Sequence, residues 1–139
     1  MRDSSATIID YYDGAYGPTL RIDVQSYDWL VLLHNYTTQL MEGEIENIDF
    51  LNLDKVEAID ISSFKLYKSR KKYVYCPVRK TYDADKKLVF TWLYSADQLY
   101  HILGLIERLI EVDRPGHQYL TDGSGKEIKE IIVELAYKE

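Results

Sequence analysis

The chain has few of the features that indicate a membrane, secreted or disulfide-bonded protein. Its 139 residues contain one cysteine, which excludes an internal disulfide framework and is typical of a reducing compartment. No apolar run approaches the roughly 20 residues that cross a bilayer. Residues 1–12 are charged and lack an apolar core, so they do not form a secretory signal. We therefore expect a cytoplasmic protein with no membrane contact.

Signatures of metal, nucleotide and catalytic sites are also missing. The histidines His34, His101 and His117 are scattered and have no second ligand at the spacing that zinc or iron requires. No glycine-rich turn joins a strand to a helix, which argues against dinucleotide and P-loop binding. Cys76 is expected on the apolar face of a strand, as a small buried hydrophobe. We predict a protein that is not an enzyme and holds no metal or cofactor.

Charge, by contrast, is plentiful and unevenly distributed. The net charge is −6, yet residues 65–87 hold nine basic side chains against two aspartates. This segment therefore carries +7 and the rest of the chain −13. Residues 42–60 contain seven acidic side chains and one lysine. The overall acidity argues against nucleic acid as a partner and favours a basic one, although plain solubility explains the same charges.

The chain is also rich in tyrosine, with 13 in total. Tyrosine combines an apolar ring with a hydrogen-bonding tip, which suits surfaces that are wet in the free protein and buried in a complex. The basic segment 65–87 interleaves four tyrosines, as nucleic-acid-binding surfaces do. Strand alternation would instead place its lysines on the water face, where they oppose edge-to-edge aggregation. We favour that second interpretation.

Hydrophobic periodicity predicts the fold of the first half. Residues 6–12 and 19–24 read as two strands of a hairpin. A helix follows, with Ser26 as its N-cap, an end near Glu42 and Gly43 as the left-handed stop. Residues 44–54 form a loop or a short edge strand. Residues 56–67 are extended, with a bulge near Ser62 that absorbs a change of phase.

The second half is predicted in the same way. Strands are expected at residues 73–78 and 88–92, on either side of a turn at residues 82–85. Ser95 and Gln98 form a capping box, and an apolar stripe runs from Leu99 to Ile110. The helix ends at residues 113–116, a polar loop follows, and residues 128–137 form the last strand.

These elements predict one domain, residues 1–139, of the α+β class. The expected architecture is a mostly antiparallel sheet of about six strands with two helices packed on one face. The order of elements is ββ-α-βββ-α-β.

About the last 50 residues combine a tryptophan strand at Trp92, the capped helix, the motif Gly116-His117-Gln118-Tyr119-Leu120 and a closing strand that contains Glu134. In these features the chain resembles small α+β immunity proteins of bacterial polymorphic-toxin systems. The resemblance implies a non-enzymatic cytoplasmic protein that binds and blocks a cognate toxin.

Three functions are therefore open. The first is a protein-binding inhibitor of the immunity type, which neutralises a basic toxin domain by occlusion. The second is a ligand-binding protein or enzyme with a pocket between sheet and helices, involving His117 and Cys76. The third is a homodimer or larger homo-oligomer joined by sheet edges. For the first, the expected contacts are Glu42, Glu44, Glu46, Asp49, Tyr11, Tyr12, His117 and Gln118.

Overall fold

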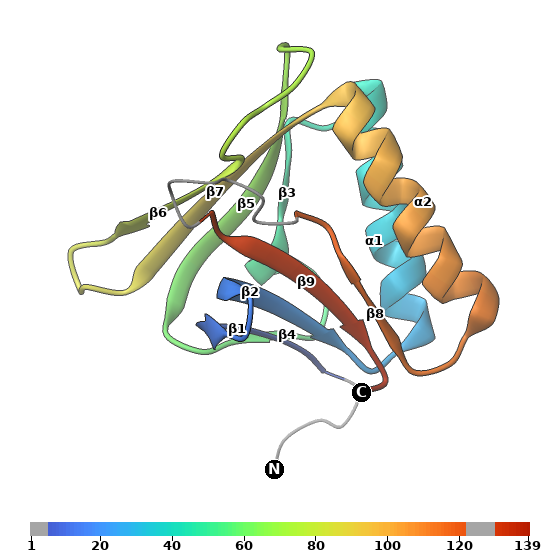
Figure 1. Ribbon diagram of the computed structural model, residues 1–139, viewed down its shortest axis with the longest axis horizontal. Coiled ribbons are helices and arrows are strands. Elements are labelled where there is room, and N and C mark those ends of the chain that lie inside the picture. The colour runs from blue at the N-terminus through green and yellow to red at the C-terminus, as the bar shows by residue number, and fades with distance from the viewer. Residues whose placement is uncertain (1–5, 122–129) are drawn as a thin grey trace.

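The computed structural model describes residues 6–121 and 130–139, which form two helices and nine strands in two mixed sheets (Figure 1). Sheet A has the spatial order β4 (Val56–Ala58), β1 (Thr7–Gly14), β2 (Gly17–Val24), β9 (Ile132–Tyr137), β8 (Gly116–Tyr119). Sheet B has the order β3 (Asn47–Asp49), β5 (Ile61–Ser69), β7 (Leu88–Ser95), β6 (Val78–Tyr82). The helices are α1 (Tyr27–Glu42) and α2 (Ala96–Val112), and a 3₁₀ turn, η1 (Phe50–Asn52), follows β3.

The α+β class and the overall order of elements are confirmed, but the strands are divided between two sheets. Among the described residues, four strand pairs are antiparallel, and three are parallel: β1 with β4, β2 with β9, and β5 with β7. The sheets are therefore more mixed than the mostly antiparallel sheet that the sequence predicted. The extra strands are short or lie at sheet edges, where local periodicity is weakest.

The two helices run antiparallel beside each other and cover one side of the molecule (Figure 1). Both contact strands of the two sheets, so they close the space where the sheets converge. His34 on α1 and Glu107 on α2 join them, with Nε2 and Oε1 2.9 Å apart. Neither described helix is long and apolar enough to span a membrane.

The core lies between the inner faces of the sheets and the apolar stripes of the helices. Phe64 stacks on Phe50 with ring centroids 4.3 Å apart and on Trp92 at 6.1 Å. Tyr11 of sheet A contacts Phe90 of sheet B at 5.1 Å, which links the two sheets. Offset aromatic pairs of this kind add to the free energy gained by burying their area.

Several local predictions are confirmed. The hairpin β1–β2 forms around a two-residue turn, and Gly17 has a φ of 128° that favours glycine. Helix α1 ends at Glu42, and Gly43 is left-handed with φ 81°, but the Ser26 side chain makes no capping hydrogen bond. The Ser95–Gln98 capping box at the start of α2 is complete.

The extended run predicted at residues 56–67 is interrupted. Residues 56–58 belong to sheet A and residues 61–69 to sheet B, so the chain changes sheets at Ile59 and Asp60. Asp60 takes a left-handed φ of 57° at this corner, and Ile59 is exposed. The predicted bulge is present between Ile61 and Ser63.

The strand predicted at residues 73–78 is wrong. Residues 70–77 form a loop, which we call loop 70–77, and the strand β6 begins only at Val78. Cys76 is therefore exposed rather than buried, and its φ of 50° is incompatible with a strand. Val74 gives its backbone hydrogen bonds to the Gln98 side chain instead of a neighbouring strand.

The polar loop predicted after α2 is also corrected. Residues 116–119 form β8, which pairs antiparallel with β9. Leu120 is buried, and its carbonyl accepts a 2.6 Å hydrogen bond from the Tyr94 hydroxyl. The last strand runs from Ile132 to Tyr137, and its expected start at residue 128 lies outside the described residues.

Candidate functional site

One surface of sheet A points away from the core and carries most of the charge of that sheet. Side chains alternate along a strand, so Ile22 lies in the core and Arg21 on the outside. From Arg21 the register extends to Asp10 on β1, Glu134 on β9 and Tyr119 on β8. We call this surface the acidic face. It comprises Ile8, Asp10, Tyr12, Arg21, Asp23, Glu57, His117, Tyr119 and Glu134, with Tyr16 from the hairpin tip and Glu139 from the C-terminus.

The acidic face has five carboxylates and one guanidinium, a net charge of −4 if His117 is neutral. The guanidinium, Arg21, lies 3.9 Å from Glu134 and 3.4 Å from Glu139. Burial lowers the pKa of Arg21, but hydrogen bonding with Tyr12 and the charge of Glu134 outweigh it and raise that pKa above its ordinary value. Arg21 therefore stays charged and neutralises the β9 side of the face.

On the opposite side of the acidic face, carboxylates outnumber the cations, and Arg21 is the register neighbour of Asp10. Asp10, Asp23 and Arg21 line an open depression of about 450 Å³, together with Ile8, Ile59 and Tyr12. Burial raises the pKa of Asp10 above its ordinary value, and the charge of Asp23 raises it further, against a lowering effect of Arg21. Ionised Asp10 is thus held where a cation would stabilise it.

Three tyrosines surround these charges with exposed rings. Tyr16 is 80% exposed, Tyr119 40% and Tyr12 37%. The Tyr119 ring contacts Tyr16 at a centroid distance of 6.4 Å and His117 at 5.4 Å. Tyrosine is enriched among residues that contribute strongly to protein interfaces, and rings already held by neighbours lose little entropy on binding.

The expected contact residues do not form one surface. Glu42, Glu44 and Glu46 are exposed where α1 ends and the chain approaches sheet B, whereas Asp49 is partly buried on β3. Lys68 donates a 2.8 Å hydrogen bond to the Met41 carbonyl, so basic and acidic segments meet there.

The remaining expected contacts belong to sheet A and divide between its two sides. Tyr12 and His117 lie on the acidic face, and His117 Nδ1 is 2.9 Å from Glu139 Oε1. Tyr11 faces inward, where Lys80 Nζ lies 5.2 Å from its ring centroid. Gln118 pairs with the core residue Leu135 and shares its inward side. Alternation along residues 19–24 places Arg21 and Asp23 on the side of the strand opposite Leu20 and Ile22. The pairing of β2 with β9 is needed to bring Glu134 beside Arg21 on the acidic face.

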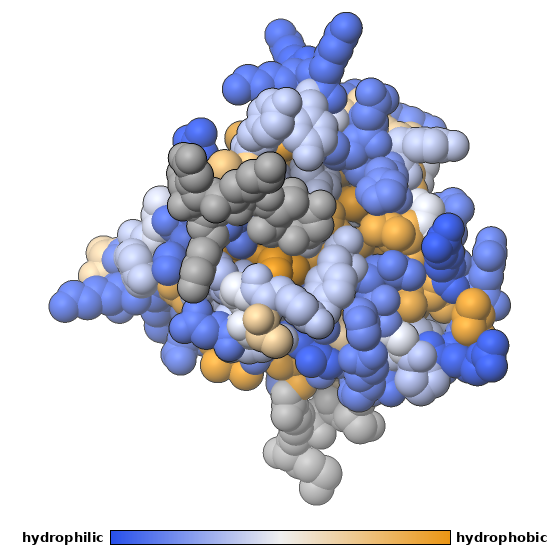
Figure 2. Space-filling view, viewed as in Figure 1, coloured by the Kyte–Doolittle hydropathy of each residue, from blue (hydrophilic) through white to orange (hydrophobic). Residues whose placement is uncertain are grey.

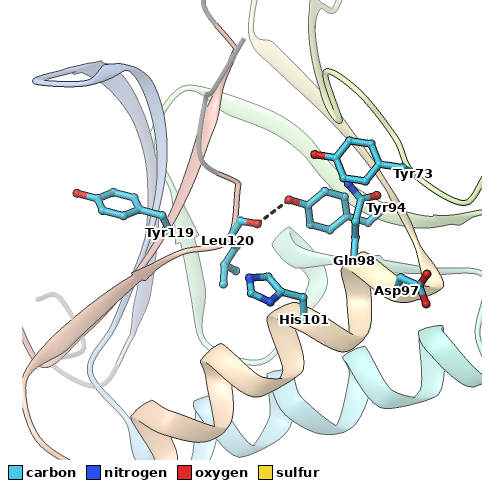
Figure 3. Close-up of a pocket in the computed structure, with 7 residues that line it drawn as sticks. All are labelled: Tyr73, Tyr94, Asp97, Gln98, His101, Tyr119 and Leu120. Carbon is cyan, nitrogen blue, oxygen red and sulfur yellow. Dashed lines mark hydrogen bonds between the residues drawn. The ribbon is translucent and has the colours of Figure 1, made fainter.

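A cleft between sheets and helix is the second candidate (Figure 3). It has a volume of about 370 Å³ and is lined by Tyr73, Tyr94, Asp97, Gln98, His101, Tyr119 and Leu120. In Figure 3 the His101 ring points toward Leu120, while the Tyr119 ring points away from the cleft. The Tyr94 hydroxyl and the Gln98 amide are engaged in internal hydrogen bonds. No described residue orients His101 by a hydrogen bond. The lining of the cleft among the described residues therefore has no oriented histidine for acid–base chemistry.

The pairing of Cys76 with His117 does not occur in any of the clefts described here. His117 lines none of them, and the Cys76 thiol instead donates to Glu130 Oε1 at 3.3 Å. That hydrogen bond raises the pKa of the Cys76 thiol, which makes the nucleophilic thiolate scarcer. Within residues 6–121 and 130–139 no three histidine, cysteine or acidic side chains are arranged to hold a metal ion.

The outermost strands of the two sheets are β4, β8, β3 and β6. The edge strand β6 carries exposed Arg79 and Lys80, which oppose pairing with another edge.

Hydrophilic residues dominate the side of the molecule that Figure 2 shows, and apolar residues appear there only in small separate areas. Comparison of the sequence with protein-family models, with curated proteins and with solved structures finds no significant match.

Proposed function

We propose that the protein is a non-enzymatic, protein-binding inhibitor of the immunity type, and that its acidic face covers a basic surface of a cognate bacterial toxin. The observation that carries the proposal is the meeting of five carboxylates and three exposed tyrosines on one side of sheet A. The motif behind the family resemblance contributes His117 and Tyr119 to this face.

The electrostatics suit a cationic partner. In the depression two carboxylates, Asp10 and Asp23, face one guanidinium. Arg21 also pairs with Glu134 and Glu139, so a lysine or arginine side chain that enters the depression meets an excess of negative charge. Unlike charges on two surfaces accelerate association and lose that effect as salt rises. The tyrosine rings supply the apolar contact that fixes the bound position.

The size of the face is compatible with this role. Five strands about 4.8 Å apart span roughly 20 Å, and six residues at about 3.3 Å each span a similar length. This gives a flat area of about 400 Å², and a standard interface needs about 800 Å² on each partner. The projecting tyrosines and the hairpin tip would therefore have to take part in binding.

The proposal predicts that a toxin is encoded beside this chain, and the absence of such a gene would count against it. The test uses the purified domain of that toxin, with binding followed by surface plasmon resonance and by inhibition of toxicity. Asp10→Asn and Asp23→Asn should each slow association and weaken binding by about tenfold, an effect of about 1.4 kcal/mol. Glu44→Gln and Glu111→Gln make the same charge change outside the face and serve as controls.

Asp10→Asn has a second expected effect that separates function from stability. Because the folded-state pKa of Asp10 is raised, its ionisation disfavours the folded state as the pH rises through the carboxyl range. The variant should therefore be more stable than the native chain at pH 7, although it binds less tightly. A toxin domain that neither binds nor loses activity would refute the proposed function, and loss of binding in Glu44→Gln alone would move the interface to residues 42–46.

A further inference from the structure

The basic segment has a structure that strand alternation did not anticipate. Loop 70–77 lies outside the sheets, and Tyr73 and Tyr75 are 54% and 82% exposed. Their rings contact each other at 4.7 Å in an edge-to-face arrangement. The interpretation of these residues as the plain water face of a strand therefore does not apply to them.

A cleft of about 360 Å³ lies between this loop and the end of sheet B. Leu93 of β7 contributes to its lining, and Lys71, Tyr73, Tyr75 and Arg79 surround it. The Leu93 N–H donates a 2.9 Å hydrogen bond to the Pro77 carbonyl, which holds the loop against the sheet. A volume of this size falls within the range of small-molecule sites.

The cleft continues onto a cationic strip on the outer face of sheet B. Arg79 pairs with Thr91 on β7, and Thr91 pairs with Lys65 on β5, so the three share one row on the side opposite the core. The next row on β5 carries Tyr67 beside Leu93.

The cationic strip has one carboxylate in register with it among the described residues, because Asp49 on β3 is the neighbour of Lys65. No ion pair within the described part of the chain involves Lys65, Lys71 or Arg79, nor the exposed neighbours Arg70 and Lys72. The carboxylate nearest the loop in the described contacts is Glu130, which accepts the hydrogen bond of the Cys76 thiol.

We propose that this cleft, which we call the Tyr73–Tyr75 cleft, binds a nucleoside phosphate, either free or as one unit of a single strand. The base stacks on an exposed tyrosine ring, and Lys71 and Arg79 hold the phosphate. In a single strand, the neighbouring phosphates follow the strip toward Lys65. Exposed aromatic rings beside cations are the combination that binds single-stranded nucleic acid, whereas an acidic peptide would use only the cations and a duplex offers no free base face.

The site lies on sheet B and does not depend on the proposed role of the acidic face on sheet A. The chain as a whole is acidic, so binding relies on the local separation of charge rather than on net attraction.

The test measures fluorescence anisotropy of a labelled single-stranded oligoadenylate at several salt concentrations, with competition by AMP, inorganic phosphate, duplex DNA and polyglutamate. If three cations contact phosphates, the logarithm of the affinity should fall with the logarithm of salt with a slope of about −2. Arg79→Gln should weaken binding and reduce the slope by about 0.7. Tyr75→Leu should weaken binding on the order of tenfold and leave the slope unchanged.

Matched controls are Arg108→Gln on α2 and Tyr27→Leu at the start of α1, both exposed and outside the cleft. If AMP competes as effectively per site as the oligonucleotide, the cleft binds free nucleotides. If the oligonucleotide binds much more tightly than AMP, the cleft binds single strands. Any of three results would overturn the proposal. The first is that neither AMP nor the oligonucleotide binds, and the second is that polyglutamate or inorganic phosphate competes as well as AMP does. The third is that the control variants lose as much affinity as Arg79→Gln and Tyr75→Leu. Thermal unfolding of each variant checks that the fold is retained.

Discussion

The Gln98 side chain is the structural link between helix α2 and loop 70–77. Its Oε1 accepts hydrogen bonds from the backbone N–H of Ser95 at 3.0 Å and of Val74 at 3.1 Å. Its Nε2 donates to the Val74 carbonyl at 3.1 Å. One amide thus completes the capping box and substitutes for a strand neighbour of Val74, which is only 8% exposed.

Gln98→Ala removes all three hydrogen bonds. Each contributes about 0.5–1.5 kcal/mol net, and water replaces part of the loss because the site is half-buried. We expect the free energy of unfolding to fall by about 2 kcal/mol, measured by urea denaturation at pH 7.

Gln98→Glu separates the two roles of the side chain. A carboxylate still accepts the Ser95 N–H and is favourable in the first turn of a helix, so the cap survives. The same carboxylate places an acceptor against the Val74 carbonyl, so the loop loses its tether. We expect a global loss below about 1 kcal/mol, together with faster amide exchange in residues 70–77.

Hydrogen exchange followed by mass spectrometry distinguishes these outcomes. Both variants should expose residues 70–77 to exchange, while residues 99–110 should change only in Gln98→Ala. Two results would contradict this role of Gln98. One is a free energy of unfolding of Gln98→Ala that lies within about 0.5 kcal/mol of the native value, and the other is unchanged amide exchange of residues 70–77 in Gln98→Glu. A released loop should also weaken nucleotide binding in the Tyr73–Tyr75 cleft.

Two further predictions concern the core and the C-terminal end of β9. Phe64→Ala should lower the free energy of unfolding by about 3–5 kcal/mol, because it removes a buried ring that contacts Phe50, Phe90 and Trp92. Tyr100→Ala on the exposed side of α2 should change it by less than about 0.5 kcal/mol. Asp113 has a lowered pKa because it accepts hydrogen bonds from the Tyr137 hydroxyl and the Lys138 ammonium. Its stabilising effect is therefore complete above the unfolded-state pKa of about 4 and is lost as the pH falls through the lower folded-state pKa. The stability difference between the native chain and Asp113→Asn should be constant near neutral pH and shrink in acid, and a difference that persists at the lowest pH would contradict this assignment.

The features predicted correctly depend on neighbours close in the chain. The end of α1 at Glu42, the left-handed Gly43 and the Ser95–Gln98 box involve residues within four positions of each other, so the local order of side chains determines them. The β1–β2 hairpin belongs to the same class, because its turn and its alternation are both local.

The features missed depend on partners that are distant in the chain. Residues 116–119 have no strong strand pattern, and they become a strand because β9 offers a free edge. Loop 70–77 leaves the sheet because the amide of Gln98, 24 residues away, takes the backbone hydrogen bonds of Val74. In both places the energy of a long-range hydrogen bond outweighs a weak local preference.

The two proposed sites also depend partly on local sequence and partly on distant partners. The sequence by itself determined the excess of tyrosine, the opposed charge of its segments and the outward direction of Arg21 and Asp23 along one strand. Only the tertiary structure decided which charges meet, because Arg21 acquires Glu139 from 118 residues away through the parallel pairing of β2 with β9. Strand alternation selects a side of the sheet, but the free energy of packing two sheets and two helices together selects the neighbour.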